Sequence, residues 1–168
     1  MAYTAFHQFL KDAKAHHYAV GAFNVANMET LQAVAAAAEE AQVPVIAQVY
    51  HAHLDFAGAP YISAIGRTAA QQVTVPLCLS LDHGQSIEQA RLCIANGFNG
   101  VMIDLATSDY QRNVADTRQV VEEAHAKGCS VEAELGEIFP ADMPAEVRNS
   151  AMTDPELAAR FVRDTGID

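Results

Sequence analysis

Leu77-Cys78-Leu79-Ser80-Leu81-Asp82-His83-Gly84 is the stretch that decides the fold. Its apolar residues run straight into a carboxylic acid, an imidazole and a glycine, and Pro76 marks the start of the run. Ser86, followed three residues later by Gln89, is the pattern of a helix N-terminus. A strand that ends in reactive side chains just before a helix is typical of α/β enzymes, which place their chemistry at the carboxyl ends of parallel strands.

The same alternation of strand and helix extends from this stretch in both directions. Five short apolar runs predict strands, at 18–23, 43–49, 75–81, 100–104 and 130–135. Helices are predicted at 3–14, 28–41, 61–72, 86–97, 109–127 and 153–165, with loops at 51–60 and 136–152. Strict βα alternation implies a parallel sheet. The predicted fold class is therefore α/β, a (β/α)8 TIM-barrel type of which this chain supplies about five βα units, as one partial barrel domain over residues 1–168.

Composition restricts the classes of function. The chain has 168 residues, 51% of them hydrophobic, and a net charge of −11, which argues against binding to nucleic acid or to an anionic membrane. No apolar run is long enough to span a bilayer, and the N-terminus lacks the features of a secretory signal. The three cysteines fit no disulfide framework, so we expect buried free thiols and a cytoplasmic protein.

Charged and polar side chains gather at the ends of the predicted strands. Asp82 and His83 end one strand, and Asp104 and Glu134 end the two that follow. Glu132 shares a strand face with Glu134, and it is more simply explained as structural, because a buried carboxylate needs a partner. His51 and His53 share a face in an extended chain, but no third ligand accompanies them, so we expect solvated histidines there.

Several of these motifs occur together in one known family. The segments are Gly-Ala-Phe-Asn-Val at 21–25, Leu-Asp-His-Gly at 81–84, Gly-Phe-Asn-Gly-Val-Met-Ile-Asp at 97–104, Val-Glu-Ala-Glu-Leu-Gly at 131–136, and Thr-Asp-Pro-Glu at 153–156 with Phe-Val-Arg-Asp-Thr-Gly-Ile-Asp at 161–168. In this order they resemble the zinc-dependent class II ketose-bisphosphate aldolases, the fructose- and tagatose-bisphosphate enzymes. The resemblance covers essentially the whole chain. It implies a lyase of carbohydrate metabolism and glycolysis that cleaves a ketose 1,6-bisphosphate reversibly to dihydroxyacetone phosphate and glyceraldehyde 3-phosphate through a zinc-stabilised enediolate.

The resemblance also implies roles for individual residues. His83 matches a ligand of the catalytic zinc, and Asp82 matches the acid/base that exchanges a proton with the C4 hydroxyl. Asp104 and Glu134 match carboxylates near the metal that hold a displaced or second cation in some members. Asn24 matches a polar residue of the substrate pocket. These roles agree with the chemistry of Zn²⁺, which binds neutral imidazole and polarises a ketone while a carboxylate moves the proton.

The family completes its zinc site with two further histidines that have no counterpart in these 168 residues. We therefore expect the isolated fragment to be inactive as an aldolase, with a phosphorylated sugar as the substrate of the intact enzyme. The alternative is a non-catalytic partial barrel that serves as an assembly, regulatory or sugar-phosphate-binding protein. Because a partial parallel sheet exposes apolar edges, we expect the chain to form a homo-oligomer. Composition does not choose between fructose and tagatose.

Overall fold

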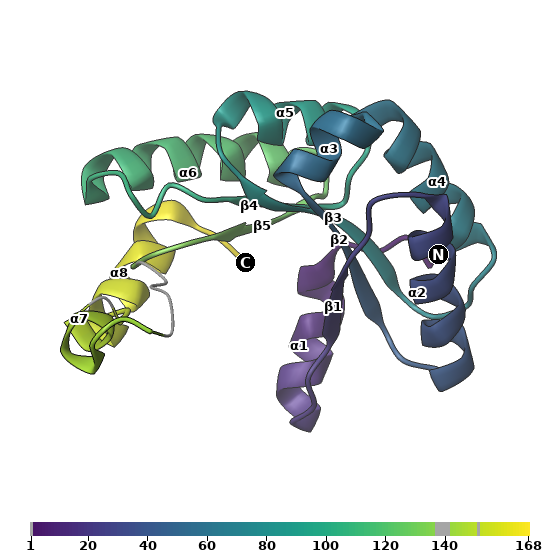
Figure 1. Cartoon of the computed structure of the whole chain (residues 1–168), viewed down its shortest axis with the longest axis horizontal. Helices are drawn as coiled ribbons and strands as arrows, with labels where there is room; N and C mark the ends of the chain where they lie inside the picture. Colours follow the sequence, from purple (N-terminus) through teal and green to yellow (C-terminus); the bar gives the residue numbers. More distant parts are fainter. Residues whose placement is uncertain (1, 137–141, 151) are drawn as a thin grey trace.

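A computed structural model describes residues 2–136, 142–150 and 152–168. Helices and strands alternate along it (Figure 1). The strands are β1 (Gly21–Asn24), β2 (Val45–Tyr50), β3 (Leu77–Gly84), β4 (Gly100–Ile103) and β5 (Ser130–Ala133). The helices are α1 (Phe6–His16), α2 (Met28–Ala41), α3 (His51–Ala57), α4 (Ala59–Gln71), α5 (Ile87–Ala95), α6 (Tyr110–His125), α7 (Ala145–Ser150) and α8 (Pro155–Thr165).

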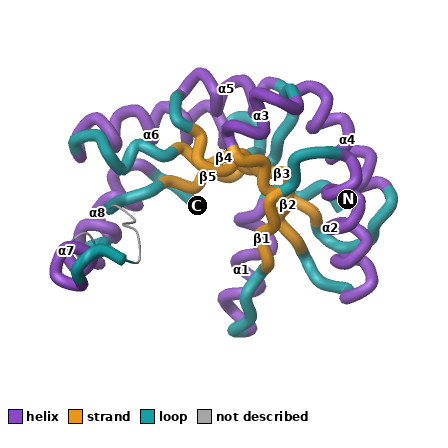
Figure 2. The backbone as a smooth tube through the Cα atoms, in the orientation of Figure 1, coloured by secondary structure: helices purple, strands orange, loops and turns teal. Residues whose placement is uncertain are grey.

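The five strands form one parallel sheet in the order β1-β2-β3-β4-β5, so each strand lies beside its neighbour in the sequence. The sheet curves, and α2 to α6 follow its outer side as an arc (Figure 2). Consecutive parallel strands joined by helices on one face are the arrangement of a (β/α) barrel. The predicted fold class and its five βα units are confirmed.

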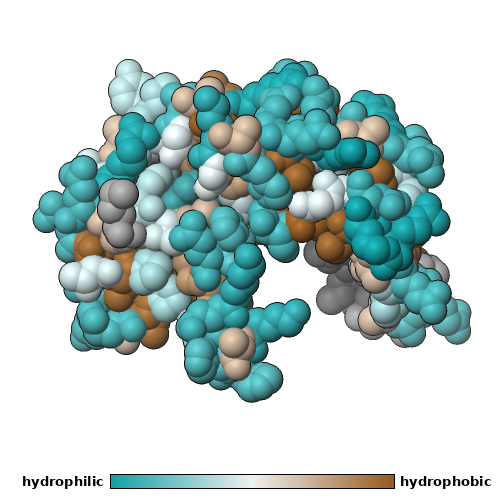
Figure 3. Space-filling view, turned by 180° about the vertical axis from the view of Figure 1, so that it is seen from behind, coloured by the Kyte–Doolittle hydropathy of each residue, from teal (hydrophilic) through white to brown (hydrophobic). Residues whose placement is uncertain are grey.

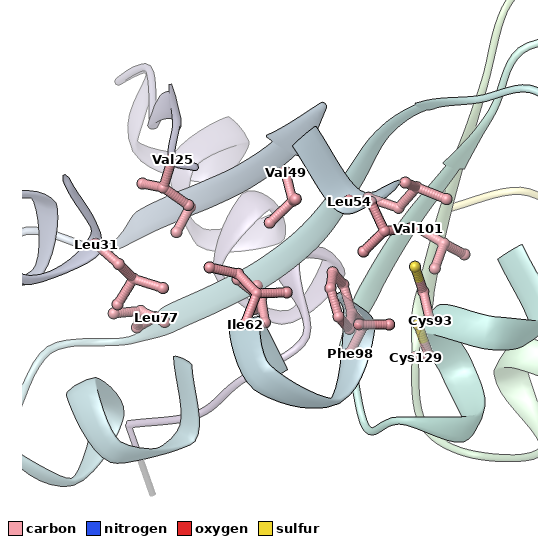
Figure 4. Packing of buried hydrophobic residues seen from close by; sticks show 14 of the residues in the cluster. Val25, Leu31, Val49, Leu54, Ile62, Leu77, Cys93, Phe98, Val101 and Cys129 are labelled. Atoms are coloured by element: carbon pink, nitrogen blue, oxygen red, sulfur yellow. The ribbon is translucent and has the colours of Figure 1, made fainter. Parts of the chain in front are cut away.

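Register sorts the strand residues onto two faces, because paired residues of parallel strands point to the same side. One face, which we call the outer face, packs against the helices. It carries a buried apolar row that includes Val49, Leu79, Val101 and Val131. Figure 4 shows Val49 and Val101 of this face in one cluster with Leu31 and Ile62 from the helices. The predicted buried thiols are confirmed, since all three cysteines are free and buried.

The opposite, concave face of the sheet, which we call the inner face, is covered near the amino ends of the strands by α1. Phe6 and Phe9 pack there against Cys78, and His7 contacts Ser130 through Nδ1 and Oγ at 2.7 Å. On α1, Phe9 is buried and the next residue, Leu10, is 37% exposed. Beyond α1 the inner face is open, and Figure 3 shows the hollow beside that helix. Charged residues at the carboxyl ends of the strands are therefore accessible from the concave side.

Local capping signals define several helix boundaries. Asn27 accepts from the backbone of Thr30, whose hydroxyl in turn accepts from the Asn27 backbone, and α2 has the predicted bounds. Ser86 accepts from the backbone of Gln89 at the start of α5, as its sequence pattern predicts. Such caps each stabilise a helix by about 1 kcal/mol.

Two of the predicted loops contain helices. Residues 51–57 form α3, which is anchored by buried Leu54 and ends at Gly58. The apolar run of β2 leads directly into this helix, so no loop separates them. The predicted loop at 136–152 contains α7, and its residues 137–141 and 151 lie outside the described part. None of the helices in the described ranges is long and apolar enough to span a membrane.

Candidate active site

Asp82 and His83 lie at an irregularity near the end of β3. Leu81 pairs with Val101, and Gly84 pairs with Ile103. Two residues of β3, Asp82 and His83, therefore lie opposite a single residue of β4, Met102. His83 has φ +49°, a left-handed conformation that costs a non-glycine residue about 1–2 kcal/mol. In a regular strand adjacent side chains point to opposite faces. This bulge lets the side chains of Asp82 and His83 both face the carboxyl end of the sheet, which we call the mouth.

Gly84 allows β4 to approach this bulge closely. Its carbonyl accepts a hydrogen bond from the backbone of Asp104 at 2.8 Å. A Cβ at this position would lie 2.6 Å from the carbonyl oxygen of Met102, which is too close for any side chain. The glycine thereby brings Asp104 within reach of His83.

His83, Asp104 and Glu134 form a cluster at the carboxyl ends of β3, β4 and β5. His83 Nδ1 lies 2.8 Å from Asp104 Oδ2 and 3.5 Å from Glu134 Oε2. Their ligand atoms all lie within 4.8 Å of one another. Among the described residues, no other group of three or more histidines, cysteines, aspartates or glutamates does so. One imidazole and two carboxylates suit Zn²⁺ and other divalent cations, so the donor set fits the metal that the sequence implies.

Asp82 lies on the inner face, where two amides contact its carboxylate. Asn24 Nδ2 donates to Oδ2 at 2.7 Å, and Gln48 Nε2 donates to Oδ1 at 3.4 Å. Asn24 and Gln48 are register partners on β1 and β2, so the sheet itself aligns them. The two donors hold the Asp82 carboxylate toward the concave side.

The charges of the site influence one another. The hydrogen bond to Asp104 raises the pKa of His83 above 6.5, and the negative charges of Asp82 and Glu134 add to the effect. Desolvation and the nearby Asp104 raise the pKa of Glu134. Glu132, also on the inner face, has a raised pKa because of desolvation and then Asp82. A cation placed here would relieve this concentration of negative charge.

Replacing Asp104 by asparagine is expected to lower the pKa of His83 in the metal-free protein, since the largest cause of the upward shift is removed. A raised folded-state pKa stabilises the fold fully below the unfolded value of 6.5, and this contribution disappears as pH rises through the folded pKa. The wild type should therefore lose stability from His83 as pH rises through that window, and the variant should lose less.

NMR titration of the His83 ring and urea unfolding at several pH values measure both effects. Asp55→Asn, on the exposed side of α3, is the matched control because it leaves the His83 contacts intact. An unchanged His83 titration in Asp104→Asn would contradict the assigned hydrogen bond.

The structure brings the sequence-predicted residues together. Asp82 contacts Asn24, and His83 contacts Asp104 and Glu134, all at the carboxyl ends of strands. Gln48 was missed, although a polar residue within the apolar run of β2 was the available signal. Tyr50 was also missed: it is the register partner of Asp82.

His51 and His53 form no group of three ligands in the described ranges. His51 instead contacts Gln85, whose side-chain amide donates to His51 Nε2 at 3.2 Å. This hydrogen bond joins the start of α3 to the turn that follows β3.

Fold and site together define a (β/α)-barrel protein with a possible divalent metal centre at its mouth. A family model described as "Fructose-bisphosphate aldolase class-II" matches residues 4–168. The chain therefore belongs to the class II fructose-bisphosphate aldolase family, whose members generally depend on a metal ion.

Individual relatives agree. Fructose-bisphosphate aldolase of Giardia intestinalis is 39% identical over 163 residues, which are 96% of this chain and 50% of the relative. The Geobacillus stearothermophilus enzyme of the same name is 38% identical over 171 residues, covering 100% of this chain and 60% of the relative. The chain thus spans about half to three-fifths of the length of these relatives.

Solved structures share the fold. The YdjI aldolase from Escherichia coli K12 superposes with a TM-score of 0.86 at 34% identity, over 99% of this chain and 62% of that one. Fructose-bisphosphate aldolase from Campylobacter jejuni, at 24% identity, has the same fold with a TM-score of 0.81, over 96% of this chain and 53% of its own.

Proposed function

We propose that these residues form the amino-terminal part of the active site of a metal-dependent ketose-bisphosphate aldolase. One observation carries the proposal: Asp82, held by Asn24, adjoins the cluster of His83, Asp104 and Glu134 on the open inner face. A proton-transferring carboxylate beside a cation site is what reversible aldol cleavage requires. Family membership supports the same reaction class.

The proposed substrate is a fructose or tagatose 1,6-bisphosphate. A divalent cation, which we take to be zinc, would be held by His83 with Asp104 and Glu134, and would draw electron density from the ketone carbonyl. Asp82 accepts the proton of the C4 hydroxyl while the C3–C4 bond breaks. The electron pair of that bond passes into the three-carbon ketone fragment, and C4 becomes the aldehyde of glyceraldehyde 3-phosphate. The ketone fragment takes a proton from water at C3 to become dihydroxyacetone phosphate, and Asp82 returns its proton to water.

The polar contacts of Asp82 suit this role. A carboxylate that accepts protons needs a fixed direction, and the Asn24 amide supplies it at 2.7 Å. Asn24 thereby serves the substrate pocket through Asp82. We further place the reaction in cytoplasmic carbohydrate metabolism, as the family suggests.

Replacing His83 by alanine is expected to weaken Zn²⁺ binding at least about 100-fold, more than the loss of a residue that merely supports a ligand. Calorimetric titration of the metal-free chain measures this. His16→Ala is the matched control, because it removes an imidazole at the end of α1 that contacts Asp12 and not the cluster. Equal Zn²⁺ affinity in wild type and His83→Ala, or no uptake by the wild type, would refute the proposed metal centre. Cleavage of fructose 1,6-bisphosphate, followed by coupled reduction of dihydroxyacetone phosphate, tests the activity itself in a completed barrel, because the isolated chain is expected to be inactive.

A second candidate function is a non-catalytic partial barrel that assembles with other copies. In the described ranges β1 and β5 each pair on one side only, and all four residues of β1 are exposed. Phe23, 54% exposed on the outer face, adds apolar surface at this edge. Sedimentation analysis together with the Zn²⁺ titration distinguishes the candidates: a homo-oligomer without Zn²⁺ uptake supports assembly, and Zn²⁺ uptake that His83→Ala weakens supports the aldolase.

A further inference from the structure

Tyr50 occupies the last position of β2 at the mouth of the site. It is the register partner of Asp82, so its side chain faces the same concave side, and it remains 37% exposed. The next residue, His51, already begins α3, and no loop intervenes. The position of the Tyr50 ring is therefore determined by two regular elements.

The Tyr50 ring lies among three imidazoles. The His51 ring centroid is 4.3 Å away with the planes tilted by 57°, and the His53 centroid is 5.8 Å away in an edge arrangement. The ring of His83 lies 6.4 Å away at 70°, also edge-to-face. Separations of 4.5–7 Å in this orientation are those at which aromatic rings attract one another.

His83 needs such support because of its backbone and its partners. Its φ of +49° is unfavourable for a residue with a side chain, and the other positive-φ residues apart from glycine in the described ranges, His17 and Gln42, end helices. Asp104 and Glu134 both contact Nδ1, so they hold one edge of the imidazole ring. Tyr50 contacts the ring itself.

The turn that follows His83 is tied to α3 as well. The side-chain amide of Gln85 donates to His51 Nε2, and Gln89 Nε2 donates to the His51 carbonyl at 3.5 Å. His51, at the start of α3, is therefore bonded to Gln85 in the turn after β3 and to Gln89 in α5. Tyr50, the residue before it, lies beside His83.

We propose that Tyr50 is a positioning residue for His83. The edge-to-face contact between the two rings fixes the plane of the imidazole so that Nδ1 stays between the carboxylates of Asp104 and Glu134. The consequence for cation binding rests on the proposed metal centre, but the positioning itself concerns the metal-free chain. An aromatic ring is required and its hydroxyl is not, because the contact is between rings.

Tyr50→Ala tests the proposal, with Tyr50→Phe as the conservative variant and Tyr61→Ala as the control for loss of an exposed tyrosine. In the metal-free protein of Tyr50→Ala, the NMR signals of the His83 ring protons should shift because the ring current of Tyr50 is lost. Nuclear Overhauser effects between the rings at positions 50 and 83 should disappear as well. Tyr50→Phe should keep the wild-type shifts and these Overhauser effects. Titration with Co²⁺ should show affinity lowered about 10–100-fold in Tyr50→Ala and near wild type in the other two. Circular dichroism verifies that all variants are folded.

The outcomes separate this proposal from the preceding one. A wild type that binds no Co²⁺ refutes the metal centre, and the NMR contacts of metal-free His83 then decide on Tyr50 alone. Unchanged His83 signals in Tyr50→Ala overturn the positioning role, as does Co²⁺ binding that Tyr50→Ala leaves intact. Weakening by Tyr50→Phe equal to that by Tyr50→Ala also overturns it, because the hydroxyl would then be the active group.

Discussion

Turnover of fructose 1,6-bisphosphate is expected to fall about 10²–10⁴-fold when Asp82 is replaced by alanine in a complete barrel, the usual contribution of a general acid/base. Zn²⁺ affinity should stay nearly unchanged, because Asp82 contacts the amides of Asn24 and Gln48, and the ligand cluster is formed by His83 and its two carboxylates. The combination of lost turnover with retained metal is the signature of a proton-transferring group.

A chimera makes this measurement possible. Residues 1–168 align with 60% of the Geobacillus stearothermophilus fructose-bisphosphate aldolase, so the remaining part of that enzyme can complete the barrel. Asp55→Ala, on the exposed side of α3, is the control for removing an acid near the mouth. A loss of less than tenfold in an active chimera would contradict the assigned role of Asp82.

Asn24→Ala in the same chimera provides a finer comparison. In the proposed role the Asn24 amide orients Asp82, so its removal should lower turnover less than the removal of Asp82 itself. A larger loss for Asn24→Ala would instead indicate that the amide binds the substrate directly.

Replacing Phe161 by alanine is expected to lower the free energy of unfolding by about 3–5 kcal/mol, the range for deleting a buried aromatic side chain. Phe161 is 2% exposed, and it anchors α8, with its ring edge-to-face against Tyr110 of α6 at 6.1 Å. The substitution removes the contact with Tyr110 and leaves a cavity between α8 and α6.

Urea unfolding of the 168-residue chain measures this change. Val162, the next residue and 46% exposed, is the matched control, and Val162→Ala should alter stability by less than about 0.5 kcal/mol. Similar losses in the two variants would mean that α8 does not pack as the structure has it.

Local signals explain why many boundaries were predictable. Asn27 and Ser86 satisfy the first free backbone groups of their helices through their own side chains, so neither cap depends on the rest of the molecule. Glycine after a helix acts in the same local way, and Gly166 adopts the left-handed conformation that ends α8. Apolar runs of strand length between such signals were sufficient to place β2 and β4 within two residues, whereas β3 extends three residues beyond its predicted end because the bulge at Asp82 and His83 continues the pairing to Gly84.

Long-range packing explains the errors. Residues 51–57 carry no strong helix pattern, and α3 exists because Leu54 finds a buried position against the sheet. Phe9 rather than Leu10 is buried because α1 meets the inner face, which a helix pattern alone does not reveal.

The sequence by itself determined that strands end in acids and an imidazole, because the alternation of apolar runs and caps is written in neighbouring residues. It also determined the family, through motifs that follow one another in order. Only the tertiary structure decided that His83 meets Asp104 and Glu134 while Asp82 meets Asn24. Those distances depend on the bulge in β3 and on the curvature of five paired strands, and both arise from contacts between residues 20 to 60 positions apart.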